Sequence, residues 1–227
     1  MTYSIWHPLN TDSAITTVEK IIGQKLSNLC ITRNSYINRV YEMETIEKER
    51  FIVKFYRPKR WSSDMILEEH AYLQDCYKKE IPVIPPLRFN NKTLFFYHNI
   101  PLAIFPKKGG RAIDELDEAL WKETGRLLGR LHSQGLSVKQ SSRVHWRPAL
   151  ATNNHLKSIE EKNVIPEDYR DIFLRSATQF IDKSDPFFDN IETFLIHGDC
   201  HFGNIIYRPF IINIIKRVSK ALKLLVL

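Results

Sequence analysis

The chain has 227 residues, of which 43% are hydrophobic and 26% charged, and its formal net charge at pH 7 is +7. This composition is typical of a globular protein and excludes collagen-like and wholly disordered chains. No Asp or Glu occurs in residues 205–227, which carry five of the seven excess charges on Arg208, Lys216, Arg217, Lys220 and Lys223. A nucleic-acid-binding fold should carry its positive face on the folded body, so the charge pattern predicts no nucleic-acid partner.

The cysteines and the N-terminus indicate the compartment. Cys30, Cys76 and Cys200 form no C-x-x-C pair, which predicts a reducing environment without a disulfide framework. The first residues lack the basic-then-apolar order of a signal peptide. No stretch approaches the roughly 18 uncharged apolar residues that span a bilayer. We therefore expect a cytoplasmic protein without a membrane partner.

The first part of the chain is predicted to be rich in strands. Ser62, Ser63 and Asp64 are N-cap candidates for a helix over residues 65–77. Strands are predicted at 36–43, 51–56, 93–97 and 101–106. Together these elements predict an N-terminal lobe over residues 1–106.

A glycine-containing linker at 107–111 separates this lobe from a helical region. A second lobe is predicted over 112–208, with one helix ending near Gly135 and another at 166–183. Residues 193–196 are expected to lead as a strand into a polar loop. A basic and apolar tail follows at 209–227. This order predicts an α+β, bilobal, protein-kinase-like fold.

The polar loop carries the strongest chemical signal, His197-x-Asp199-x-x-x-x-Asn204. Protein kinases use a catalytic loop with this spacing. Asp199 would accept the proton of the acceptor hydroxyl, and the amide oxygen of Asn204 would reach a metal ion on the nucleotide phosphates. Gly198 and Gly203 would permit tight turns. The alternative is a polar turn in which His197 is a hydrogen-bonded core histidine.

A zinc site is a second alternative for this loop. His197, Asp199 and His201 alternate, and alternate residues of an extended segment can share one zinc ion. The two glycines and Asn204 favour phosphoryl transfer.

Lys54 lies inside an apolar predicted strand, where an ammonium group is costly unless it has a partner. In kinases the lysine at this place contacts the nucleotide phosphates and pairs with a glutamate of the next helix. Glu68 and Glu69 are available, and Glu69 is preferred because it lies four residues before Leu73 on the expected sheet-facing side. The alternative is a lysine that snorkels from an edge strand.

Several segments together resemble the bacterial stress response kinase A family, a serine/threonine protein kinase branch of the aminoglycoside-phosphotransferase-like kinases. They are residues 34–41, 53–61, 66–70, 105–106 with 109–111, and 197–204. The resemblance covers roughly residues 30–208. It implies a cytoplasmic enzyme that uses ATP and Mg²⁺ and phosphorylates Ser or Thr of proteins in a stress response, and we expect a monomer.

The resemblance also implies roles for individual residues. Ser35 would lie in the loop over the phosphates, which lacks the G-x-G-x-x-G of ordinary protein kinases. Lys54 would be the nucleotide lysine, Asp199 the proton acceptor and Asn204 a magnesium ligand. Ile37 departs from the acidic residue of the family motif, which affects the detail of the phosphate loop.

The family pattern has an aspartate after the catalytic loop as a second metal ligand. No Asp or Glu follows Asp199 here, and Asn213 falls at that place if the turn is two residues shorter. An amide oxygen is a weaker ligand for a hard cation than a carboxylate. We therefore expect a C-terminally truncated or frame-shifted chain with impaired transfer. The alternative is a cationic amphipathic helix over 214–227 that lies on an acidic membrane.

Other functions remain open at this stage. The acceptor could be a small molecule such as an aminoglycoside, choline or homoserine, because acceptor choice depends largely on helices of the second lobe. The missing metal aspartate would also suit a pseudokinase that binds nucleotide without catalysis. Nucleic-acid binding through the tail ranks last.

Overall fold

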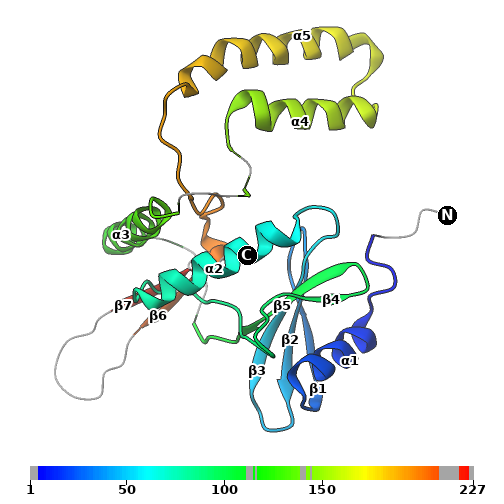
Figure 1. Cartoon of the computed structure of the whole chain (residues 1–227), viewed down its shortest axis with the longest axis vertical. Helices are drawn as coiled ribbons and strands as arrows, with labels where there is room; N and C mark the ends of the chain where they lie inside the picture. Colours follow the sequence, from blue (N-terminus) through cyan, green and yellow to red (C-terminus); the bar gives the residue numbers. More distant parts are fainter. Residues whose placement is uncertain are drawn as a thin grey trace. The chain divides into compact units, whose positions relative to one another are not determined.

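The protein is described by a computed structural model that covers residues 5–110, 115, 117–138, 142–143, 145–209 and 220–224. By contacts it divides into two units, Met1–Lys139 with Ile196–Leu227, and Gln140–Leu195. The helices and strands are α1 (Thr11–Ile22), β1 (Leu26–Arg33), β2 (Arg39–Thr45), β3 (Arg50–Phe55), α2 (Ser63–Lys78), β4 (Phe95–Tyr97), β5 (Ile100–Pro106), α3 (Glu118–Gly135), α4 (Pro148–Glu161), α5 (Glu167–Ser184), β6 (Ile205–Pro209) and β7 (Lys220–Leu224), with short 3-10 turns at Asp185–Phe188 and Phe202–Asn204 (Figure 1).

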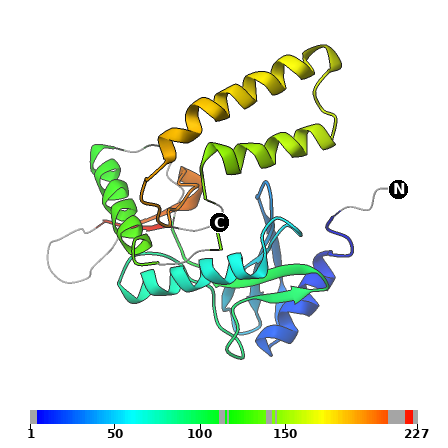
Figure 2. The ribbon, with the colours of Figure 1, turned by 45° about the horizontal axis from the view of Figure 1, so that its top comes forward.

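The first unit contains an antiparallel sheet with the strand order β1-β2-β3-β5-β4. Side chains alternate between the two faces of a strand. Val53 and Phe55 are fully buried on the face that packs against Ala14 and Val18 of α1. Lys54 therefore projects from the opposite face of the central strand β3. Figures 1 and 2 show α1 and α2 on the two sides of this sheet.

Helix α1 begins at a capping box, in which Asn10 and Ser13 bond each other's backbone amides, and it ends at Gly23 in the left-handed region. Sequence reasoning did not predict α1, β1 or α4. It did predict β3 and β5 closely, and it predicted α2 with Ser62 among its N-cap candidates. The Ser62 hydroxyl accepts the Met65 amide at 3.2 Å, which confirms that cap.

Helix α2 joins the sheet to the segment that follows the polar loop. Near its start, Ile66 packs with Tyr56, Leu94 and Phe105 of the sheet region. Near its end, a core cluster joins α2, α3 and β6 through buried apolar side chains, among them Leu73, Cys76, Leu127, Leu131, Ile205 and Tyr207. Leu127 and Leu131 thus anchor α3 in this core. The cluster fixes the strand that directly follows residues 197–204.

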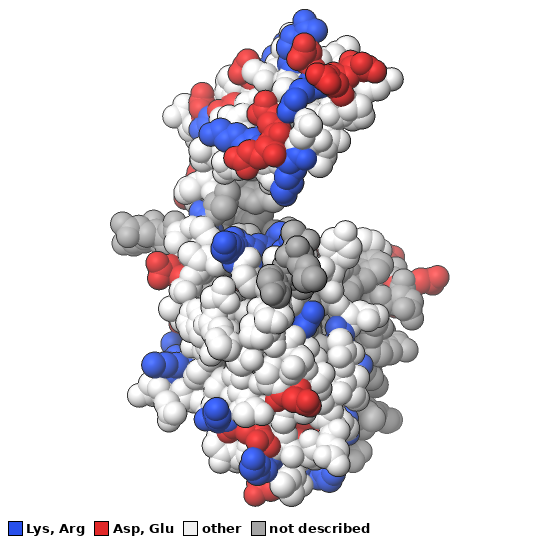
Figure 3. All heavy atoms as spheres, turned by 90° about the vertical axis from the view of Figure 1, so that its right-hand side faces the viewer, with Lys and Arg blue, Asp and Glu red and all other residues white. Residues whose placement is uncertain are grey.

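The second unit is a hairpin of α4 and α5. Arg147 precedes α4, and its Nε donates to Asp185 Oδ1 at 3.0 Å. The same carboxylate oxygen accepts the Ala149 amide of the first turn of α4 at 2.7 Å. Asp185 therefore ties the start of α4 to the end of α5. In Figure 3, Lys and Arg are interspersed with Asp and Glu on the visible face of this hairpin.

Two expectations are wrong. Residues 193–196 form no strand and precede the polar loop as irregular chain. A helix over 214–227 is contradicted at Lys220–Leu224, which form β7 and pair antiparallel with β6. Asn213 lies outside the described residues. The lobe boundaries at 106, 107–111 and 208 stay predictions.

Candidate active site

The loop 197–204 brings Asp199 and Asn204 into direct contact. The Asn204 side-chain amide donates to the Asp199 backbone oxygen at 2.7 Å and to Asp199 Oδ2 at 3.2 Å. Gly198 has φ +75°, a conformation that favours glycine. The side chain of Asp199 is 69% exposed, whereas Asn204 is 1% exposed. The loop therefore presents a carboxylate to solvent and holds an amide beneath it.

The buried amide of Asn204 leaves one polar atom available to a ligand. Its nitrogen is used by Asp199, and its Oδ1 has no hydrogen-bond partner among the described residues. An unsatisfied buried oxygen costs free energy unless a ligand supplies the missing interaction. Amide and carboxylate oxygens are the atoms that Mg²⁺ prefers. The pair formed by Asp199 and Asn204 thus fits a divalent cation, and no residue after Asp199 supplies a second carboxylate.

His197 is half-buried and supports the loop. Its Nδ1 accepts the Asp199 amide at 3.2 Å, so in the neutral ring Nε2 carries the proton. Burial lowers the pKa of His197, although the charges of Asp199 and Glu69 act in the opposite direction. A neutral His197 positions the backbone of Asp199.

The alternating residues do not form a zinc site in the part of the chain that the structure describes. His201 Nε2 lies 3.6 Å from Asp199 Oδ2, but His197 directs Nδ1 to a backbone amide. No group of three or more His, Cys, Asp or Glu side chains is placed to hold a metal ion within the described ranges.

Lys54 is 3% exposed on β3, which lies between β2 and β5. It is therefore not a snorkelling lysine of an edge strand. It pairs in register with Val40 and Ala103, and its ammonium lies 4.4 Å from the centroid of the Tyr56 ring. An ammonium over an aromatic face gains a cation–π interaction.

Glu69 lies on α2, and Ser35 lies in the turn between β1 and β2. Glu69 is half-buried, and its charge raises the pKa of His197 against the larger effect of burial. The exposed Ser35 accepts the Asn38 amide at 3.2 Å, and Asn38 Oδ1 accepts the Arg57 amide at 3.2 Å. The turn is thereby tied to the chain just after β3. Asn38, which makes this contact, lies two residues before Val40, the β2 partner of Lys54. An ion pair between Glu69 and Lys54 stays a prediction.

Comparison with known proteins then decides the family. Residues 31–212 match the phosphotransferase enzyme family. The chain belongs to this family. Stress response kinase A of Shigella flexneri is 38% identical over 180 residues, 77% of this chain and 54% of that protein. Serine/threonine protein kinase RdoA of Salmonella typhimurium is 34% identical over 212 residues, 91% of this chain and 62% of that protein.

These relatives confirm the resemblance stated from the sequence, and the chain spans about half the length of the curated relatives it matches. Solved structures of this phosphotransferase fold agree. An amicoumacin kinase in complex with AMP-PNP and Ca²⁺ has a TM-score of 0.69 at 19% identity, covering 92% of this chain and 64% of that one. A microcompartment-associated aminopropanol kinase has a TM-score of 0.63 at 16% identity, covering 93% and 68%. The α+β kinase-like fold is confirmed. Among the described residues, no helix is long and apolar enough to cross a membrane.

The sequence did not reveal two further side chains beside the phosphotransferase site. Tyr56 is buried against Lys54, and its hydroxyl lies 3.1 Å from His70 Nε2. Tyr56 follows Lys54 by two residues in the predicted strand 51–56, so strand alternation already placed both on one face, although no role was predicted for Tyr56. His70 follows Glu69 directly, but only the tertiary structure shows that it is buried.

Proposed function

We propose that the chain belongs to an ATP-dependent kinase that transfers the γ-phosphoryl group to a Ser or Thr hydroxyl of a protein in a stress response. The observation that carries the proposal is the contact between Asp199 and Asn204, which leaves a buried amide oxygen beside an exposed carboxylate. The names of the relatives support a protein acceptor. The proposal includes a cytoplasmic, monomeric enzyme.

Each site residue has a proposed task. Asp199 takes the proton of the acceptor hydroxyl as its oxygen bonds to the γ-phosphorus and the bond to the bridging oxygen of ADP breaks. Asn204 Oδ1 would hold Mg²⁺, which neutralises charge on the phosphates when bound. Lys54 binds the phosphates, Glu69 orients Lys54, and Ser35 belongs to the loop that covers them. The lobe division at 107–111 is part of this proposal.

We also propose that the metal site is weak. A kinase site normally uses an aspartate in addition to the asparagine, and no acidic residue follows Asp199. One amide and one carboxylate bind Mg²⁺ less tightly than a set with two carboxylates. Phosphoryl transfer by the 227-residue chain should therefore need a higher Mg²⁺ concentration than transfer by a kinase that has both acidic ligands.

The test uses the 227-residue chain with γ-³²P-labelled ATP, Mg²⁺ and casein as a generic protein acceptor. We expect slow, Mg²⁺-dependent labelling of casein or of the chain itself. Asp199→Asn should lower the rate by at least about 100-fold because the proton acceptor is lost. The control is Asp171→Asn, which removes an exposed carboxylate of α5 and should leave the rate unchanged.

Two outcomes would contradict the proposal. Labelling of a small alcohol or aminoglycoside, but of no protein, would assign a small-molecule acceptor. A thermal shift with ATP that does not depend on Mg²⁺, together with no labelling at all, would indicate a pseudokinase.

A further inference from the structure

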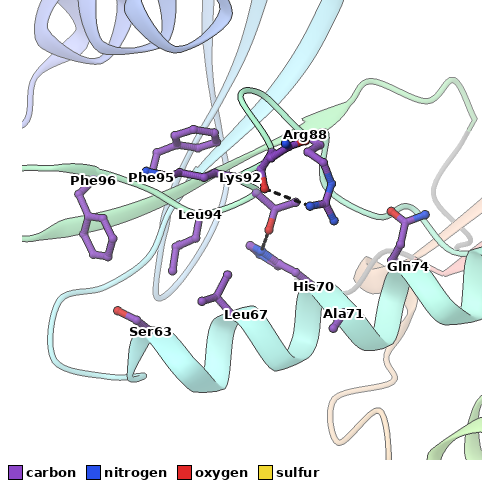
Figure 4. Close-up of a pocket in the computed structure, with 12 residues that line it drawn as sticks. Ser63, Leu67, His70, Ala71, Gln74, Arg88, Lys92, Leu94, Phe95 and Phe96 are labelled. Carbon is purple, nitrogen blue, oxygen red and sulfur yellow. Dashed lines mark hydrogen bonds between the residues drawn. The ribbon is translucent and has the colours of Figure 1, made fainter.

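An open cavity of about 600 Å³ lies between α2 and the segment from Arg88 to Phe96 (Figure 4). It is lined by none of the residues proposed for phosphoryl transfer. The turn of this segment has Asn90 and Asn91 at φ 48° and 61°, and Phe89 and Lys92 pair across it. Two consecutive residues with positive φ are typical of a tight hairpin turn, so the outer wall has a defined shape. The volume lies in the range of small-molecule sites.

The lining combines apolar side chains near the start of α2 with two cationic side chains. Leu67 and Phe96 lie toward the start of α2, and both are partly exposed. Arg88 lies toward the later turns of α2, where its guanidinium donates to the Asn91 backbone oxygen at 3.0 Å. Lys92 adds a second cation, and no lining residue is acidic. Such a cavity complements an organic anion with an apolar body.

A short chain of contacts leads from the cavity to the nucleotide lysine. His70 lines the cavity and is buried, with Nδ1 2.9 Å from the hydroxyl of Thr93, another lining residue. On its other side, Nε2 lies 3.1 Å from the Tyr56 hydroxyl. The Tyr56 ring in turn faces the Lys54 ammonium at 4.4 Å. A molecule that contacts both His70 and Thr93 is therefore connected to Lys54 through His70 and Tyr56.

We propose that this cavity binds a small organic acid, with its apolar body against Leu67 and Phe96 and its carboxylate toward Arg88 and Lys92. Its occupant contacts α2 and the β4 segment together and holds α2 on the sheet. This second part rests on the proposed function: the occupant strengthens ATP binding, and ATP strengthens binding of the acid by the same factor.

The binding test is calorimetric titration of the 227-residue chain with 2-naphthoate and with the neutral 2-naphthylmethanol. We expect 2-naphthoate to bind and the neutral analogue to bind at least about tenfold more weakly, because it lacks the charge. The double variant Arg88→Glu/Lys92→Glu should also bind naphthoate about tenfold more weakly. Both side chains are exposed, so the fold should survive.

The matched control is Lys20→Glu/Lys59→Glu, which makes the same charge change at exposed positions outside the cavity. It should retain the wild-type affinity for naphthoate. The binding proposal is overturned if the wild-type chain does not bind naphthoate, if the neutral analogue binds equally well, or if both double variants lose affinity alike.

The coupling test measures the affinity for a fluorescent ATP analogue with and without saturating 2-naphthoate. We expect affinity to rise roughly fivefold with naphthoate. Tyr56→Phe removes the hydroxyl that contacts His70 but keeps the ring over Lys54, so it should abolish the rise and retain naphthoate binding. An unchanged affinity in the wild-type chain overturns the coupling. A chain that binds naphthoate but no nucleotide would disprove the proposed function and its coupling, and would leave the cavity site supported.

Discussion

Val53, Leu102 and Ile104 in the sheet are fully buried, whereas Tyr169 and Phe180 on α5 are more than 60% exposed. The sheet strands pair with one another and pack on α1 and α2, so their apolar residues are covered within the same unit. In the hairpin, Leu156 and Ile181 are the buried apolar residues that the structure describes. Since burial of apolar surface is the main source of stability, the sheet unit should be much more stable than the hairpin.

The same difference separates the proposed nucleotide site from the α4–α5 hairpin. Lys54 and Asn204 are held by buried neighbours in the first unit. The hairpin has aromatic side chains open to solvent, including Phe187 at 79% exposure. The residues proposed to bind nucleotide and metal therefore belong to the first unit, where their burial comes from neighbours of the same unit. Three predictions test this difference in burial and stability between the sheet unit and the hairpin.

The largest expected effect comes from removing a buried side chain of the sheet. Leu102 on β5 is 0% exposed, so Leu102→Ala should lower the free energy of unfolding by about 3 kcal/mol through lost burial and a cavity. Hydrogen exchange of β3 and β5 amides measures this loss within the unit.

Phe180→Ala on α5 is the matched control, because it removes a larger side chain that is 63% exposed. It should change stability by no more than about 0.5 kcal/mol. If Phe180→Ala proved as costly as Leu102→Ala, the hairpin would bury its aromatic residues in solution and the comparison would fail.

An intermediate effect is expected at the buried carboxylate of Glu42. Its side chain is 1% exposed and forms ion pairs with Arg33, with Arg50 at 3.3 Å and with Lys107 at 3.3 Å. Glu42→Gln removes the charge but keeps the shape, and the three cations are partly exposed and can be hydrated. We therefore expect a loss of about 1–2 kcal/mol at neutral pH.

The pH dependence identifies the cause of that loss. Burial alone would raise the pKa of Glu42, but Arg33 and Lys107 outweigh it and the pKa is lowered. Glu42 therefore stabilises the fold above its ordinary pKa of about 4.3, and the contribution is lost as pH falls through the lowered value. The difference between wild type and Glu42→Gln, measured by urea unfolding, should shrink in acid. A difference that grows in acid would contradict the ion pairs. Asp171→Asn on α5 should show no comparable loss at either pH.

The elements that could be predicted are those whose signals are local. The spacing from Asp199 to Asn204 identified the loop, and Ser62 marked the start of α2. Helix α1 was missed because residues 11–22 are rich in β-branched side chains, which form helices less readily. It forms through a capping box at Asn10 and through packing on the sheet.

The remaining misses depend on contacts between distant residues. Helix α4 begins at Pro148, and its first turn is completed by Asp185, 36 positions after Ala149. Likewise, His70 meets Tyr56 and Thr93 at separations of 14 and 23 residues. No local pattern marks such partners, so α4 and the burial of His70 became visible only in the structure.

The smallest effect is expected at His197, and it locates the pH sensitivity of the first unit. Burial lowers the pKa of His197, so the unfolded chain, with a pKa of about 6.5, binds the proton first as pH falls. Stability should therefore decrease as pH falls from neutral toward the lowered pKa, by at most about 1.4 kcal/mol at pH 5.5. His197→Asn keeps an acceptor near the Asp199 amide but cannot titrate, so its unfolding free energy should be flatter over this range. His155→Asn on α4 is the control and should retain the wild-type slope in the exchange of sheet amides. If His155→Asn flattened that slope and His197→Asn did not, the pH sensitivity would belong to the hairpin, and the two units would differ less than their burial indicates.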